Sequence, residues 1–172
     1  MNIVLIGYRC SGKTAVGGVL ARELDMEFLD TDLLIEAEAG RSIDKIISEE
    51  GWAHFRDAEK GVIEEVSVSD NQVIAPGGGA VMDGNNVRNL KRNGFIVWLR
   101  GDAEVLKARM ERDPRSAVTR PSLTGTDPLE EIHQVLDIRT PLYEQAGNIM
   151  VDTGPLSIEE VAERIIKALP KT

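Results

Sequence analysis

The chain has 172 residues, a formal net charge of −9 and 42% hydrophobic residues, which suggests one soluble globular domain with a core that needs no disulfides. The net negative charge argues against a nucleic acid or an anionic membrane as partner, because such partners bind proteins through a basic face. No apolar run approaches the ~20 residues of a membrane span. The single Cys10 and an N-terminus without the pattern of a signal peptide predict a cytoplasmic protein, and nothing in the sequence demands more than a monomer.

Short apolar strands alternate with helical patterns along the chain, which predicts an α/β fold with a parallel sheet covered on both faces. The predicted strands are 2–6, 27–30, 72–75, 95–99 and 148–152. The predicted helices are 13–25, 32–39, 43–67 (with a break near Gly51), 83–93, 102–112, 127–145 and 157–169. Asp127 before Pro128 and Ser157 before Glu160 are typical helix starts.

The polar segment 113–126 lies between two predicted helices and is rich in Pro, Gly, Ser and Thr. It is long for a passive connector, so a mobile lid is one interpretation. A plain surface loop is the other, and composition does not decide between them.

Residues 7–14 (GYRCSGKT) fit the phosphate-binding pattern G-x-x-x-x-G-K-[ST] between a strand and a helix. The glycines let backbone N–H groups converge on one cavity, and the helix N-terminus adds its positive dipole end. Lys13 can reach the β- and γ-phosphates, and the Thr14 hydroxyl can bind Mg²⁺. A chance glycine-rich turn is disfavoured by the flanking elements. The predicted nucleotide contacts here are Arg9, Cys10, Ser11, Gly12, Lys13, Thr14 and Ala15.

Two carboxylates, Asp30 and Asp32, follow the second predicted strand. Ligands of open α/β sheets bind at the carboxyl ends of strands, so both should face the phosphate site. One carboxylate near Mg²⁺ and one near a substrate hydroxyl would suit phosphoryl transfer. Either residue could instead simply cap the next helix.

Three consecutive glycines, Gly77, Gly78 and Gly79, follow the third predicted strand. They suit close approach of a ligand to the main chain, although a tight turn would also use glycine. In the helix before them, Trp52, Phe55, Val62 and Val66 form a predicted buried stripe.

Three arginines stand out against the acidic background. Arg56 flanks the buried stripe, where Glu59 can hold it by an i,i+3 pair. Arg139 precedes a proline within a helical pattern, and Arg120 lies in the lid candidate, where it could close over a transferring phosphoryl group. Each arginine taken alone would default to a solvated surface residue.

Taken together, these motifs resemble the shikimate kinase family over nearly the whole chain. The resemblance is carried in order by GYRCSGKT at 7–14, DTD at 30–32, FRDAE at 55–59, GGG at 77–79, TRPSL at 119–123 and RTPLY at 139–143. It implies a P-loop kinase core with strand order 2-3-1-4-5, a helical substrate-binding region at about 33–60 and a lid at about 113–126. The implied reaction is ATP-dependent phosphorylation of the shikimate 3-hydroxyl, with Mg²⁺, in aromatic amino-acid biosynthesis.

The resemblance also implies a role for each matching residue. Asp30 would support Mg²⁺ together with Thr14, and Asp32 would orient the attacking hydroxyl and accept its proton. Lys13 and the lid residue Arg120 would stabilise the transferring phosphoryl group, and Arg109 would pack against adenine. The shikimate contacts would be Asp32, Arg56, Gly77, Gly78, Gly79 and Arg139, with the two arginines gripping the carboxylate.

Cys10 stands where this family usually has glycine, and Ser122 where leucine is more common. Two other function classes stay open on the residues alone. One is another small-molecule P-loop kinase acting on gluconate or a nucleoside monophosphate, and the other is a nucleotide-binding switch without catalysis.

Overall fold

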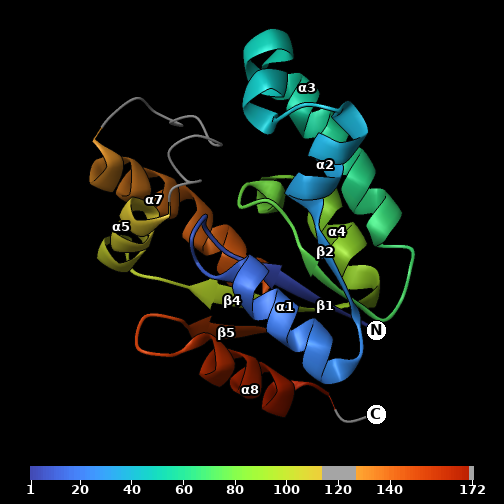
Figure 1. Cartoon of the computed structure of the whole chain (residues 1–172), viewed down its shortest axis with the longest axis vertical. Coiled ribbons are helices and arrows are strands. Elements are labelled where there is room, and N and C mark those ends of the chain that lie inside the picture. The colour runs from blue at the N-terminus through green and yellow to red at the C-terminus, as the bar shows by residue number, and fades with distance from the viewer. Residues whose placement is uncertain (114–126, 171–172) are drawn as a thin grey trace.

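The computed structural model describes residues 1–113 and 127–170 (Figure 1). Within these ranges five parallel strands form one sheet in the order β2-β3-β1-β4-β5. The strands are β1 (Asn2–Ile6), β2 (Glu27–Asp30), β3 (Gln72–Ala75), β4 (Gly94–Arg100) and β5 (Ile149–Asp152). The α/β prediction and the strand order implied by the resemblance are therefore confirmed.

Helices connect and cover the strands. They are α1 (Lys13–Leu24), α2 (Thr31–Ala39), α3 (Ile43–Val66), α4 (Gly84–Asn93), α5 (Ala103–Arg112), α7 (Pro128–Ala146) and α8 (Ile158–Ala168), with a 3₁₀ turn η1 (Ala80–Met82) that was not predicted. Every predicted strand and helix is present, and no boundary differs by more than one residue. In the described ranges, none of the helices combines the length and the apolar character that crossing a membrane requires.

Local capping chemistry explains several of these boundaries. The Asp127 carboxylate accepts hydrogen bonds from the backbone at the start of α7, with Pro128 as first helical residue. Ser157 and Glu160 form the predicted capping box of α8. Gly51 breaks α3 with φ 86° and ψ 168°, as predicted, because glycine alone adopts this backbone conformation without steric cost.

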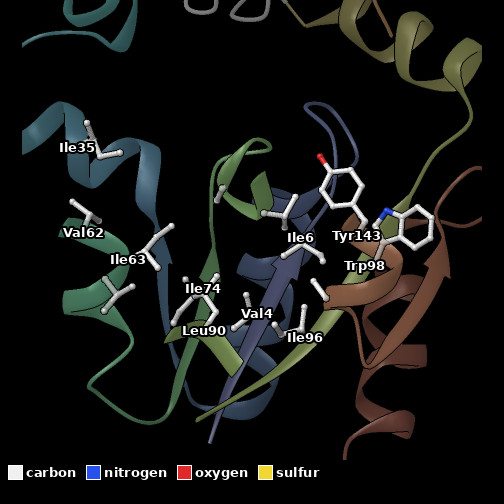
Figure 2. Close-up of a cluster of buried hydrophobic side chains, with 14 of the residues drawn as sticks. Val4, Ile6, Ile35, Val62, Ile63, Ile74, Leu90, Ile96, Trp98 and Tyr143 are labelled. Atoms are coloured by element: carbon white, nitrogen blue, oxygen red, sulfur yellow. The ribbon is translucent and has the colours of Figure 1, made fainter. Parts of the chain in front are cut away.

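The core lies on both faces of the sheet, because successive strand side chains point to opposite sides. Val4 and Ile6 of β1 pack in a cluster with α3, α4 and α7, part of which Figure 2 shows. Ile3 and Leu5 pack on the other face against α1 and α8. All four side chains are at most 2% exposed, and full burial of such a side chain contributes about 1.5–3 kcal/mol.

The predicted buried stripe of α3 is wrong at one residue, Trp52. Phe55, Val62 and Val66 are buried as expected, but Trp52 is 40% exposed. Trp52 directly follows the break at Gly51, so the direction of its side chain does not fit the helical periodicity of Phe55, Val62 and Val66.

The parallel arrangement brings three chain segments to one edge of the sheet. Gly7 follows β1, Asp30 ends β2 and Pro76 follows β3. Because all strands run the same way, their carboxyl ends lie together, and the polar residues beyond them share one site.

Candidate active site

The phosphate-loop segment leads from β1 into the first turn of α1. Gly7 has φ 149°, and a Cβ there would lie 2.5 Å from the Leu99 carbonyl oxygen. Gly12 caps α1 with φ 103°. The Lys13 ammonium donates hydrogen bonds to the carbonyls of Gly7 (2.9 Å) and Tyr8 (3.1 Å), which holds its charge beside the loop. The Lys13 ammonium and the first N–H groups of α1 thus lie where the motif predicts a phosphate site.

Cys10 occupies a backbone position suited to glycine. Its φ of 61° lies in the left-handed region, which costs a residue with a Cβ roughly 1–2 kcal/mol. This agrees with the glycine that the resemblance leads one to expect here.

Thr14 and Asp30 form a pair of oxygen ligands beside the loop. The Thr14 hydroxyl donates to Asp30 Oδ2 at 3.0 Å, while Asp30 Oδ1 accepts from the backbone of Asp32 at 3.0 Å. Asp30 therefore caps α2 through one oxygen and contacts Thr14 of the phosphate-loop motif through the other. The described parts of the chain contain no group of three or more His, Cys, Asp or Glu suited to a metal. A Mg²⁺ ion here would depend on phosphate oxygens and water for its other ligands, which is its usual preference.

Two pockets open at the carboxyl edge of the sheet. The larger has a volume of about 480 Å³ and the smaller about 80 Å³. Asp32 and Ile43 line both pockets. The Asp32 carboxylate thus lies at the junction of two binding spaces, where a group transferred from one ligand to another would pass.

The larger pocket contains most of the predicted nucleotide and metal residues. Those lining it are Cys10, Gly12, Lys13, Thr14, Ala15, Asp30 and Arg109. Ser11 does not line it, because this side chain is buried beneath the loop. The Arg109 guanidinium donates to the Thr153 hydroxyl at 2.9 Å, the Thr153 carbonyl at 2.7 Å and the Cys10 carbonyl at 3.3 Å. Arg109 is thereby held as a rigid wall of this pocket.

The smaller pocket contains the predicted acceptor contacts. Those lining it are Asp32, Arg56, Gly77, Gly78, Gly79 and Arg139. Further lining residues were not predicted as acceptor contacts, among them Tyr8, Ile47 and Trp52, because only the packing of the loop and α3 places them there.

Arg56 is held from several sides. Its Nη1 donates to Glu59 Oε2 at 2.7 Å, which confirms the predicted i,i+3 pair. Its guanidinium also lies 5.5 Å from the ring centre of Trp52 and 5.2 Å from that of Phe55, within the range of cation–π attraction. Gly79 packs directly beneath it, since a Cβ there would lie 2.5 Å from Nη2.

Glu59 is almost fully buried behind Arg56, with 1% of its surface exposed. Burial raises the pKa of the Glu59 carboxyl, and the Arg56 guanidinium opposes this effect without cancelling it. The nearby Asp32 carboxylate raises the Glu59 pKa further. Gly77 makes room for these two acids, because a Cβ there would lie within 2.9 Å of an oxygen of each.

Arg139 projects from α7 into the same pocket and is only 8% exposed, not at the surface as its isolated sequence context indicated. Within residues 1–113 and 127–170 no carboxylate forms an ion pair with it. One helical turn later, the Tyr143 hydroxyl donates to the Gly78 carbonyl at 2.6 Å and its ring stacks on Trp98, visible in Figure 2. Burial raises the pKa of Tyr143 to about 12, so this hydroxyl keeps its proton and secures the glycine turn.

Arg9, predicted as a nucleotide contact, lies on the other side of the loop from the larger pocket's lining residues. The residue lines the smaller pocket, and its side chain forms an ion pair with Glu131 of α7. Sequence reasoning missed Glu131, which is 122 positions away. Arg120 and the lid candidate other than Asp113 lie outside the described residues.

Comparison with known proteins agrees with this arrangement. A family profile described as shikimate kinase matches residues 9–170. The chain belongs to the shikimate kinase family. It is 42% identical over 169 residues to the shikimate kinase of Symbiobacterium thermophilum, covering 98% of this chain and 96% of that relative.

Solved structures of shikimate kinases are also similar. The enzyme from Acinetobacter baumannii in complex with shikimate has a TM-score of 0.90 at 34% identity, covering 96% of this chain and 90% of that one. The enzyme from Aquifex aeolicus has a TM-score of 0.80 at 32% identity, covering 98% and 95%. Both the fold and the family are therefore shown independently of the motifs.

Proposed function

We propose that this shikimate kinase family member transfers the γ-phosphoryl group of ATP to the 3-hydroxyl of shikimate, with the larger pocket binding ATP and the smaller binding shikimate. The observation that supports this most directly is the position of Asp32, which lines both pockets. A hydroxyl bound in the smaller pocket would therefore meet a carboxylate at the boundary with the phosphate site.

In this proposal the acceptor is recognised by its charge and hydroxyl groups. Shikimate is a small hydroxylated carboxylate, and guanidinium groups bind planar carboxylates through paired hydrogen bonds. Arg139 supplies a cation that forms no ion pair with a described carboxylate, and Arg56 is already oriented by Glu59. The backbone of Gly78 and Gly79 completes the wall of the pocket.

Catalysis would depend on positioning and on charge stabilisation. Asp32 would orient the attacking hydroxyl and accept its proton. Lys13, held at the loop by two carbonyls, would stabilise charge on the transferring phosphoryl group. Arg120 would add a second cation from the lid.

Mg²⁺ bound with ATP would be held by Thr14 and, through water, by Asp30. The oxygen pair that these two side chains form fits the preference of this hard cation. When bound, the ion would neutralise phosphate charge. We further propose that the protein is a cytoplasmic monomer, in keeping with its single cysteine and its acidic surface.

The test is an ADP-release assay with Mg²⁺-ATP and equal concentrations of shikimate, gluconate or AMP. We expect turnover with shikimate alone. Turnover with gluconate or AMP instead would refute the arginine assignments, and ATP binding without turnover on any acceptor would favour a nucleotide switch. A Lys13→Met variant serves as the control for contaminating kinases.

A further inference from the structure

Arg9 of the phosphate loop lies on the acceptor side. By its position in the motif, Arg9 belongs with the residues that surround phosphates. Arg9 nevertheless lines the smaller pocket, together with Arg56 and Arg139, and does not line the larger one. The loop thus borders both pockets, with Arg9 on the acceptor side.

Glu131 holds this arginine in place. The Arg9 Nη2 pairs with Glu131 Oε1, and the two side chains are only 11% and 3% exposed. The guanidinium also lies 5.5 Å from the centre of the Tyr8 ring. Desolvating both charges is costly, and most surface ion pairs of this chain avoid that cost, as Arg22 and Glu23 do at 70% and 52% exposure. The pair therefore fixes the guanidinium more tightly than a solvated arginine would be fixed.

One carboxylate does not satisfy the whole guanidinium. Arginine has five N–H donors, and Glu131 engages the Nη2 group. The Nε–H of Arg9 is buried and has no hydrogen-bond partner in the part of the chain that the structure describes. A held guanidinium with unused donors on a pocket wall is suited to binding ligand oxygens.

We propose that Arg9 binds oxygen atoms of the acceptor in the smaller pocket, and that Glu131 is the positioning residue that holds it there. This rests on the proposed function, because it assigns the smaller pocket to shikimate. Helix α7 then supports two cationic contacts to the acceptor. Arg139 comes from the helix itself, and Glu131 of the helix holds Arg9 of the phosphate loop. The same pair ties the phosphate loop to α7, so the spacing of the two ligands depends on it.

The main test is the double variant Arg9→Met/Glu131→Leu. It removes both charges and keeps side chains of similar volume, a replacement that often leaves stability intact for buried ion pairs. We expect an unfolding midpoint close to wild type, a KM for shikimate raised about tenfold or more, and a KM for ATP within about twofold of wild type. Glu131→Gln alone should raise the KM for shikimate by a smaller factor, because the guanidinium loses its anchor.

Arg100→Met is the matched control. Arg100 forms ion pairs with Asp102 and Asp152 and lines neither pocket, so both KM values should match wild type. If the double variant folds and its KM for shikimate equals that of Arg100→Met, the pair is only structural and the proposal is wrong. An equal rise in both KM values would assign Arg9 to the nucleotide and also overturn it.

A second variant keeps the test decisive if the double variant does not fold. Arg9→Lys retains the charge but lacks the planar fork, so we expect a raised KM for shikimate with an unchanged unfolding midpoint. An unchanged KM in this variant would refute the proposal. A wild-type enzyme that does not phosphorylate shikimate would refute the proposed function and this proposal with it, whereas unchanged variants of an active wild type refute this proposal alone.

Discussion

Gly79 is the residue at which a single added methyl group should reveal how the acceptor is held. A Cβ at this position would lie 2.5 Å from Arg56 Nη2 and 2.9 Å from Nη1. Arg56 cannot move away freely, because Glu59 accepts from its Nη1 at 2.7 Å and the Trp52 and Phe55 rings flank it. Gly79→Ala should therefore displace the guanidinium from its position in the smaller pocket.

The size of the effect follows from these distances. Nη2 must retreat by about 0.9 Å to reach an ordinary van der Waals distance of 3.4 Å from the new methyl group. A hydrogen bond to a charged group contributes about 1.5–3 kcal/mol. At about 1.4 kcal/mol for each factor of ten, losing one such bond raises the KM for shikimate roughly 10- to 150-fold. Gly79 does not line the larger pocket, so the KM for ATP should stay within about twofold of wild type.

The assay is steady-state ADP release with shikimate and ATP varied in turn. Gly61→Ala in α3 is the control, because a Cβ there would meet no heavy atom within 4 Å. It should keep both KM values and gain up to about 1 kcal/mol of helix stability. If Gly79→Ala and Gly61→Ala have the same KM for shikimate, the argument that Gly79 supports an acceptor-binding Arg56 is refuted.

Three further predictions concern the reaction, pH and the loop. Asp32→Asn should lower kcat at least about 100-fold while calorimetry finds ATP affinity nearly unchanged, and a wild-type kcat would remove Asp32 from proton transfer. Because burial raises the Glu59 pKa above its ordinary 4.5, this group's contribution to stability is full below that value and is lost as the pH rises through the raised pKa. Urea denaturation should then show Glu59→Gln gaining stability relative to wild type with rising pH, whereas a constant difference would contradict the shift. Cys10→Gly should relieve a φ of 61° and raise the Tm by about 2–4 °C, and calorimetry showing a lower Tm would mean that Cys10 contacts outweigh the strain.

The amino-acid sequence by itself determined the order and limits of the helices and strands. Hydrophobic periodicity, capping residues and glycine positions act within a few residues of one another, so they can be recognised without knowing the fold. The same holds for the phosphate loop, whose glycines and lysine form one continuous motif. The Arg56–Glu59 pair was also predictable, because three residues along a helix place two side chains together.

Beyond the contacts that the family resemblance implied, only the tertiary structure decided which distant residues share a pocket. It placed Arg9 at the smaller pocket and joined its side chain to Glu131, 122 positions away. It also buried Arg139, which taken alone would default to the surface and which only the family resemblance assigned to the acceptor, and it exposed Trp52, which periodicity placed in the core. The reason is physical: contacts between elements depend on how whole helices pack on the sheet, and the direction of one long side chain there is set by neighbours that local periodicity does not specify.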